Sequence, residues 1–237
     1  MARIGSTLLV LALLGGTAAA FAVTERLKVQ PSPITRVRIE NKVFSPRHGA
    51  ASIGFGLRKS DGLTLLLVDG AGEAVRELVP GHRVRRGFHS WAWDGRDDAG
   101  RPLQDGTYRP RVQLEDARRT IVLPNPIQLD STPPQITVLE VGRAAITPNG
   151  DRRSDSLVIR YRVDEPARAL LYADGMLGQR RKQRQLEGTL RWYGRVGGKR
   201  LDAGRYELAV AAEDIVNNRS RRVPAGTVHI SYPRESE

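Results

Sequence analysis

Short runs of alternating apolar and polar residues recur along most of this chain and predict β-strands. Val37 and Ile39 alternate with charged residues, and after a turn Ile53, Phe55 and Leu57 repeat the pattern. Residues two apart face the same side of an extended chain, so this alternation is typical of a half-buried strand. The strands expected beyond these cover residues 63–68, 74–79, 88–93, 108–114, 120–129, 135–141, 156–163, 168–173, 186–193, 205–212 and 223–232.

No segment after residue 28 has an apolar stripe of helical period, which argues against an α/β fold. The run 63–68 is continuously apolar and is expected to be a central strand. We interpret residues 80–87 as a basic loop between two strands, and residues 214–218 as a late turn. Strands punctuated by turns at this spacing favour an antiparallel β-sandwich.

A strand, a turn-rich excursion and a second strand at residues 91–108 are repeated about a hundred residues later. Such a repeat is longer than a solenoid unit, so we expect two copies of one domain. The first copy of the motif has Trp93, Asp94, Gly95, Arg96, Gly100, Gly106 and Tyr108, and the second has Trp192, Gly194, Arg195, Gly204 and Tyr206.

The run WDGRDDAGRPLQDGTYRPRV resembles the Ig-like domain first named from the flagellar hook-capping protein FlgD. The second copy is degenerate, because Tyr193 stands in place of the Asp and Val196-Gly197 in place of Asp97-Asp98. The resemblance covers roughly residues 35–232. It implies a β-sandwich module of a kind found in bacterial surface and secreted proteins, and the hook-interacting region of FlgD has no counterpart here.

These patterns predict an all-β chain with two tandem Ig-like antiparallel β-sandwiches after one N-terminal hydrophobic helix. Asp130-Ser131-Thr132-Pro133-Pro134 marks the boundary between the two domains, because its prolines lack a backbone donor and stiffen the joint. The expected parts are a signal anchor or signal peptide at 1–28, a proline-containing spacer at 29–34, domain 1 at 35–130, domain 2 at 131–232 and a tail at 233–237.

The N-terminal run Ile4–Val23 is uncharged and long enough to span a bilayer. Two interpretations stay open. A signal anchor would leave a single-pass protein in the cell membrane through residues 4–23, with both domains outside. A cleavable signal peptide, with its small-residue site near Ala22, would give a secreted protein.

The formal net charge of +12 invites a nucleic-acid hypothesis, but the basic residues divide evenly, 19 before residue 130 and 19 after it. Because they do not gather on one element, we expect no nucleic-acid partner. The one dense run is Arg180-Arg181-Lys182 with Arg184, which is either a contact for an anionic polymer or a solvated face.

The sequence offers no recognisable catalytic constellation. It has no cysteine, and no histidine among His48, His82, His89 and His229 lies in a metal-binding or general-base motif. No phosphate-binding or nucleophile motif appears. Trp91 and Trp93 would face the same side of a strand, which favours core packing over a sugar-stacking platform. We therefore expect no enzyme activity and no cofactor.

Two loops contain oxygen ligands of the type that calcium prefers, and we expect no firm metal site in either. Asn149, Asp151 and Asp155 are the better candidates, and the other loop has Asp94, Asp97 and Asp98. Neither loop has the EF-hand spacing, and the adjacent Arg152-Arg153 would repel a cation.

The leading hypothesis is an exported, non-enzymatic envelope protein that acts as a scaffold, spacer or protein-binding module. Its expected partners are other envelope proteins or cell-wall polymer. The alternatives are an accessory module that binds cell wall or polysaccharide through arginine-rich faces, and a factor like those of flagellar hook assembly, which rests on analogy alone.

Overall fold

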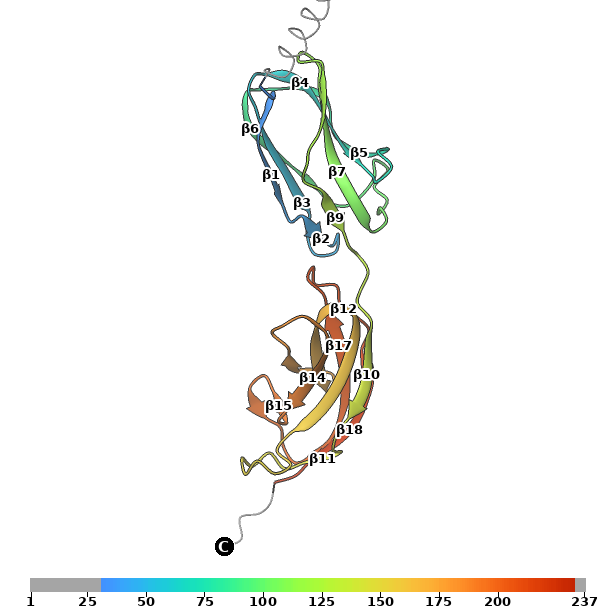
Figure 1. Cartoon of the computed structure of the whole chain (residues 1–237). Helices are drawn as coiled ribbons and strands as arrows, with labels where there is room; N and C mark the ends of the chain where they lie inside the picture. Colours follow the sequence, from blue (N-terminus) through green and yellow to red (C-terminus); the bar gives the residue numbers. More distant parts are fainter. Residues whose placement is uncertain (1–30, 233–237) are drawn as a thin grey trace, which may run out of the picture.

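The computed structural model describes residues 31–232, which form strands and turns and no helix (Figure 1). The all-β prediction is therefore confirmed for this part of the chain. The predicted N-terminal hydrophobic helix and the tail at 233–237 lie outside the described residues. Within residues 31–232 there is no helix of the length and apolarity that a membrane span requires.

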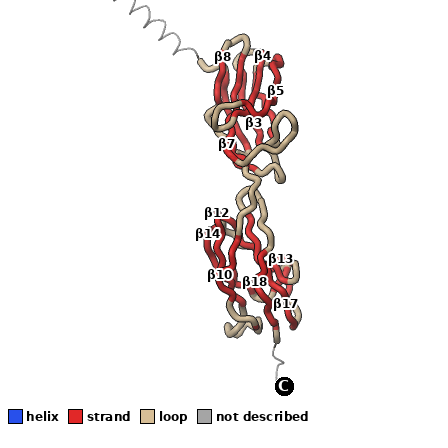
Figure 2. Tube along the Cα trace, turned by 90° about the vertical axis from the view of Figure 1, so that its right-hand side faces the viewer, coloured by secondary structure: helices blue, strands red, loops and turns tan. Residues whose placement is uncertain are grey.

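The strands form two groups that are placed end to end, with separate hydrophobic cores (Figures 1 and 2). We call the group up to Asp130 domain 1 and the group after it domain 2. The chain passes between them once, through residues 130–135, as Figure 1 shows. The described segment begins at the far end of domain 1 and ends at the opposite end of domain 2.

Domain 1 is a sandwich of two sheets. One sheet has the order β1-β3-β6, and the other has the order β2-β9-β7-β4-β5, with β8 paired to β7. The strands are β1 (Ile34–Glu40), β2 (Val43–Phe44), β3 (Ala51–Leu57), β4 (Asp61–Val68), β5 (Ala74–Val84), β6 (Gly87–Trp93), β7 (Gly106–Leu114), β8 (Arg119–Val122) and β9 (Ile127–Leu129).

The core of domain 1 follows from strand alternation. Ile53 and Phe55 of β3 and Leu63 and Leu65 of β4 have fully buried side chains that meet between the sheets. The expected central strand is β4, which lies between β7 and β5. Each large apolar side chain removed from water contributes about 2 kcal/mol, so these alternating positions stabilise the sandwich.

Domain 2 has its strands in the same order. β10, the first half of β12 and β14 form one layer, and β11-β18-β17-β12-β13 form the other. The strands are β10 (Ile136–Val141), β11 (Ala145–Ile146), β12 (Leu157–Ala173), β13 (Met176–Arg180), β14 (Gln185–Trp192), β15 (Arg195–Val196), β16 (Lys199–Arg200), β17 (Gly204–Glu213) and β18 (Val223–Ile230).

Two strand predictions and one loop prediction need correction. The two strands expected at 156–163 and 168–173 are one strand, β12, which continues through a bend with a shift in register between Arg162 and Ala167. The expected basic loop at 80–87 is largely the end of β5, which pairs with β4 as far as Val84. The strand expected at 120–129 is two short strands, β8 and β9.

Candidate functional site

The motif residues of domain 1 form a clamp that holds the turn-rich excursion between β6 and β7. The indole Nε1 of Trp93 donates a hydrogen bond to the carbonyl of Arg96 at 3.2 Å. The Arg96 guanidinium donates to the carbonyl of Gly100 at 2.7 Å, and the Tyr108 hydroxyl donates to the carbonyl of Gln104 at 2.7 Å. All three side chains donate to backbone carbonyls of the same excursion. The clamp therefore stabilises the local structure.

The second copy of the motif makes the same three bonds. Trp192 Nε1 donates to the carbonyl of Arg195 at 2.7 Å, Arg195 donates to Gly198 at 3.1 Å, and the Tyr206 hydroxyl donates to Asp202 at 3.0 Å. The later glycines of the motif, Gly106 and Gly204, are the first residues of β7 and β17.

Each clamp needs a glycine directly before its arginine. Gly95 has φ +80° and Gly194 has φ +62°, a left-handed conformation that side chains disfavour. A Cβ atom on Gly95 would also lie 2.7 Å from Leu129 Cδ1, and one on Gly194 would lie 3.0 Å from Ile230 Cδ1. The glycines therefore let each excursion pack against the last strand of its domain.

The two tryptophans of β6 pack on the core, as expected. The Trp93 side chain is buried, and its ring meets Phe44 and Tyr108 edge-on at 5.6 and 5.1 Å between centroids. Trp91 is half-buried and lies 5.1 Å from the Phe55 ring. This packing leaves no aromatic platform at Trp93 for a ligand.

The aspartates of the first excursion bind backbone groups. Asp94 accepts from the N–H of Arg96, and Asp97 accepts from the N–H and guanidinium of Arg101. The Arg101 N–H is the main cause of the lowered pKa of Asp97. Asp98 accepts from the N–H of Glu77 at 2.9 Å. The three carboxylates thus face different partners and do not converge.

The calcium candidates of the second loop also form hydrogen bonds within their own turn. Asp155 accepts from the N–H groups of Gly150 and Arg152 at 3.0 and 2.8 Å. Asp151 accepts from the N–H of Arg153 at 2.6 Å and from the side chain of Asn149. The bond from the Arg153 N–H is the first cause of the lowered pKa of Asp151. These carboxylates shape the turn and are not aimed at one point.

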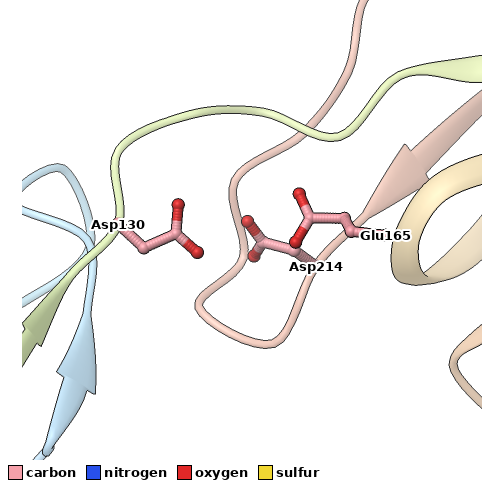
Figure 3. Close-up of side chains that lie close together, drawn as sticks. All are labelled: Asp130, Glu165 and Asp214. Atoms are coloured by element: carbon pink, nitrogen blue, oxygen red, sulfur yellow. The ribbon is translucent and has the colours of Figure 1, made fainter. Parts of the chain in front are cut away.

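A group of carboxylates that the sequence reasoning missed lies at the domain junction. Asp130, Glu165 and Asp214 come from three distant segments, and one oxygen of each lies within 4.8 Å of the others (Figure 3). Asp130 follows β9, Glu165 is in the bend of β12, and Asp214 follows β17. Only the fold brings them together, because no short motif links these positions.

Hydrogen bonds tie the linker to both domains next to this group. Asp105 of domain 1 accepts from the N–H of Ser131 at 2.7 Å and from the hydroxyl of Thr132. Burial raises the pKa of Asp105, but these bonds from Thr132 and Ser131 outweigh it and leave the pKa lowered. Asn218 of domain 2 donates through Nδ2 to the carbonyl of Asp130 at 3.0 Å.

A buried ion pair lies beside the junction. Glu213 is buried, and its carboxylate accepts from the guanidinium groups of Arg180 and Arg219, the latter at 2.7 Å. Burial pushes the pKa of Glu213 up, but the bonds from Arg219 and Arg180 outweigh this and hold it below its ordinary range. Arg180 of the predicted basic run therefore has a structural partner.

The FlgD Ig-like domain model matches residues 41–118, about a third of the chain. This region contains the first clamp and most of domain 1. The prediction that domain 1 resembles this family is confirmed, and the match does not extend to domain 2. A search of curated protein sequences found no significant match.

Several solved structures are similar at low sequence identity. The fibronectin(III)-like modules of Clostridium thermocellum CbhA are 13% identical with a TM-score of 0.44, covering 85% of this chain and 97% of theirs. FlgD from P. aeruginosa is 20% identical with a TM-score of 0.29, covering 47% of this chain and 73% of its own. A bacterial ice-binding adhesin is 13% identical with a TM-score of 0.39, covering 86% and 67%. No functional conclusion follows at these values.

Proposed function

We propose that this chain is an exported, non-enzymatic protein of the bacterial cell envelope, in which two Ig-like domains act as a scaffold or spacer for protein partners. The observation that carries the proposal is the end-to-end placement of two sandwiches with the same strand order. Because the described chain enters at one end and leaves at the other, the domains separate whatever is attached to their two ends.

Three further points support this proposal. Residues 41–118 match a family of Ig-like domains, and we infer that residues 131–232 are a second, degenerate copy, because the clamp bonds recur there. The apolar run at residues 4–23 is suited to hold the chain in a membrane with both domains outside. Sandwich domains present edge strands and end loops, through which they bind other proteins.

The test is a crosslinking pull-down of the tagged full-length chain from intact cells, with mass spectrometry of the envelope fraction. We expect defined protein partners, and recovery of the peptide containing residues 4–23 would show an anchor. Recovery of the chain with neither protein partners nor wall material would contradict the scaffold proposal. Turnover of an envelope polymer that is lost in a single point variant would contradict the non-enzymatic part.

A second candidate, binding of an anionic cell-wall polymer, is favoured by one surface. Arg47 and His48 of domain 1 line a hollow together with Arg180, Arg219 and Glu213 of domain 2, so its three arginines outnumber its one carboxylate. Binding of this kind would weaken as salt screens the charges. Co-sedimentation with purified cell walls that falls steeply between low and high salt would support it, and salt-independent sedimentation would exclude it.

A further inference from the structure

The junction carboxylates converge although they come from separate parts of the fold. Figure 3 shows the side chains of Asp130, Asp214 and Glu165 turned toward one another between the linker and domain 2. Asp130 belongs to the end of domain 1, and the other two belong to domain 2. The cluster therefore spans the single connection between the domains.

In the part of the chain that the structure describes, no arginine or lysine pairs with this cluster. Within residues 31–232, none of the ion pairs includes any of the three carboxylates, in a chain with 38 arginines and lysines. Burial, followed by the charge of Asp214, raises the pKa of Asp130. Burial, followed by the charges of Asp130 and Asp214, raises the pKa of Glu165. The neighbouring Glu213 differs from these carboxylates because it forms ion pairs with two arginines.

A second observation points to a ligand. The Asp214 side chain is fully buried, and its Oδ1 accepts from the N–H groups of Val216 and Asn218 at 2.8 and 2.9 Å. Its other oxygen, Oδ2, has no hydrogen-bond partner. Asn218 is also buried, and its Oδ1 lacks a partner while its Nδ2 donates to Asp130. A buried acceptor without a partner is costly unless something else contacts it.

We propose that Asp130, Glu165 and Asp214 bind a calcium ion at the domain junction. Two oxygens that bind the same calcium at about 2.4 Å lie no more than about 4.8 Å apart, and the three carboxylates meet this limit. The donor set consists of hard oxygens without histidine or cysteine, which suits calcium and not zinc. Calcium also accepts six to eight oxygens in irregular geometry, so the site would need further ligands, and the unpartnered Asn218 Oδ1 lies in the same turn as Asp214.

The ion would link the two domains. It would join the end of β9 to the bend of β12 and to the turn after β17, beside the hydrogen bond from Asn218 to Asp130. This site does not depend on which partner the protein binds. It assigns the junction a binding role that is separate from the scaffold proposal.

The test is calorimetric titration of calcium into the purified full-length chain after EDTA treatment, with melting curves in EDTA, calcium and magnesium. We expect one calcium per chain and a higher melting temperature in millimolar calcium than in EDTA or magnesium. Asp130→Asn and Asp214→Asn should each weaken calcium binding by about tenfold or more. The amide of Asp214→Asn keeps an acceptor for the N–H groups of Val216 and Asn218.

Three comparisons keep the result interpretable. Asp130→Asn removes one repelling charge, so in EDTA it should melt at or above the wild-type temperature. Such a melting temperature would show that the variant is folded and that its loss of calcium binding has another cause than misfolding. Asp116→Asn changes an exposed aspartate of domain 1 that pairs with Arg83, and Asp151→Asn changes the loop at 147–155; both should bind calcium normally. An unchanged melting temperature with no heat of binding would overturn the proposal. So would binding that survives Asp130→Asn and is lost in Asp151→Asn.

Discussion

The same dipeptide has opposite surroundings in the two domains. Seven and eight residues after the clamp tyrosine, domain 1 has Glu115-Asp116 and domain 2 has Glu213-Asp214. The first pair is exposed, with Asp116 bound to Arg83 at 2.8 Å, whereas the second pair is buried. Within residues 31–232, no other domain adjoins the far end of domain 1, whereas the corresponding end of domain 2 faces domain 1. In domain 2, Arg180 and Arg219 bind Glu213. The N–H groups of the turn after β17 bind Asp214. The comparison teaches that equivalent positions of a repeat take their environment from the segments packed beside them.

The two clamps show the reverse relation: their sequences differ, but their hydrogen bonds to backbone carbonyls are the same. In domain 1, Asp97 binds Arg101, and this pair has no counterpart in domain 2. Antiparallel pairing crosses both excursions, as a single bridge between Arg96 and Pro102 in domain 1 and as β15 with β16 in domain 2. What remains constant is the set of groups that bind backbone carbonyls, and a carbonyl is present whatever the side chain. This explains how the second copy tolerates its substitutions.

The largest expected effect comes from removing the clamp tryptophans. Trp93→Ala and Trp192→Ala should each destabilise the protein by about 3–5 kcal/mol, because each removes a buried ring and leaves a cavity. Urea unfolding of the full-length chain followed by circular dichroism would measure both. A loss below about 1 kcal/mol for only one of them would show that the two clamps are not equivalent.

Glu213→Gln tests whether the buried dipeptide contributes more to stability than the exposed one. We expect a loss of about 2 kcal/mol at neutral pH, because two partly exposed arginines lose a buried charge partner. The matched change Glu115→Gln, at an exposed side chain, should cost less than about 0.5 kcal/mol.

The pH dependence of Glu213 follows from its lowered pKa in the folded protein. Its contribution is complete above the pKa of the unfolded chain and is lost as the pH falls through the lower pKa of the folded state. Wild type and Glu213→Gln should therefore converge in stability in acid, below the ordinary pKa of 4.5. Urea midpoints measured from pH 7 downward that stay equally far apart would contradict this assignment.

Alanine substitutions at the clamp glycines compare how tightly each excursion packs against the last strand of its domain. Gly95→Ala should cost about 2 kcal/mol or more, since strain at positive φ adds to a close contact with Leu129, and Gly194→Ala should cost about 1 kcal/mol less. Gly100→Ala is the control for strain alone, because no atom lies within 4 Å of its Cβ position. Equal losses at all three positions in urea unfolding would show that the contact to the last strand is unimportant.

The smallest effect is expected at the clamp tyrosines. Tyr108→Phe should cost about 1 kcal/mol, because the buried ring loses its hydrogen bond to Gln104. Tyr206→Phe should cost about half as much, because its ring is more exposed and its bond to Asp202 is longer. Thermal melting of both variants would measure this, and a larger loss for Tyr206→Phe would reverse the order.

Sequence patterns predicted the all-β architecture because alternation and turn residues are local signals. They failed where pairing is not visible in the side chains. Residues 80–84 have the pattern of a loop because Pro80 and Gly81 are turn residues and the next two side chains are basic. Their backbone nevertheless pairs with β4, at a register shift beside Gly81, which has φ +61°. The short strand β13 was missed because Met176 and Leu177 are exposed and do not alternate.

The junction site lay beyond sequence reasoning for a different reason. Asp130, Glu165 and Asp214 are separated by dozens of residues, and each alone is an ordinary acidic residue in a turn or bend. One signal was available: the Glu-Asp pair recurs at the same distance from both clamp tyrosines. It identifies equivalent positions in the two domains, but it does not show that only the second pair is buried.

The short parallel pairs at the sheet edges give each domain a way to resist mechanical force. In domain 1, the N–H groups of Gln128 and Asp130 donate to Lys42 and Phe44, and β11 and β18 make the matching pair in domain 2. A pull on the two ends of the chain would draw β2 and β9 in opposite directions along their length. These bonds would then be loaded together in shear, so each domain would resist tension applied between its two ends.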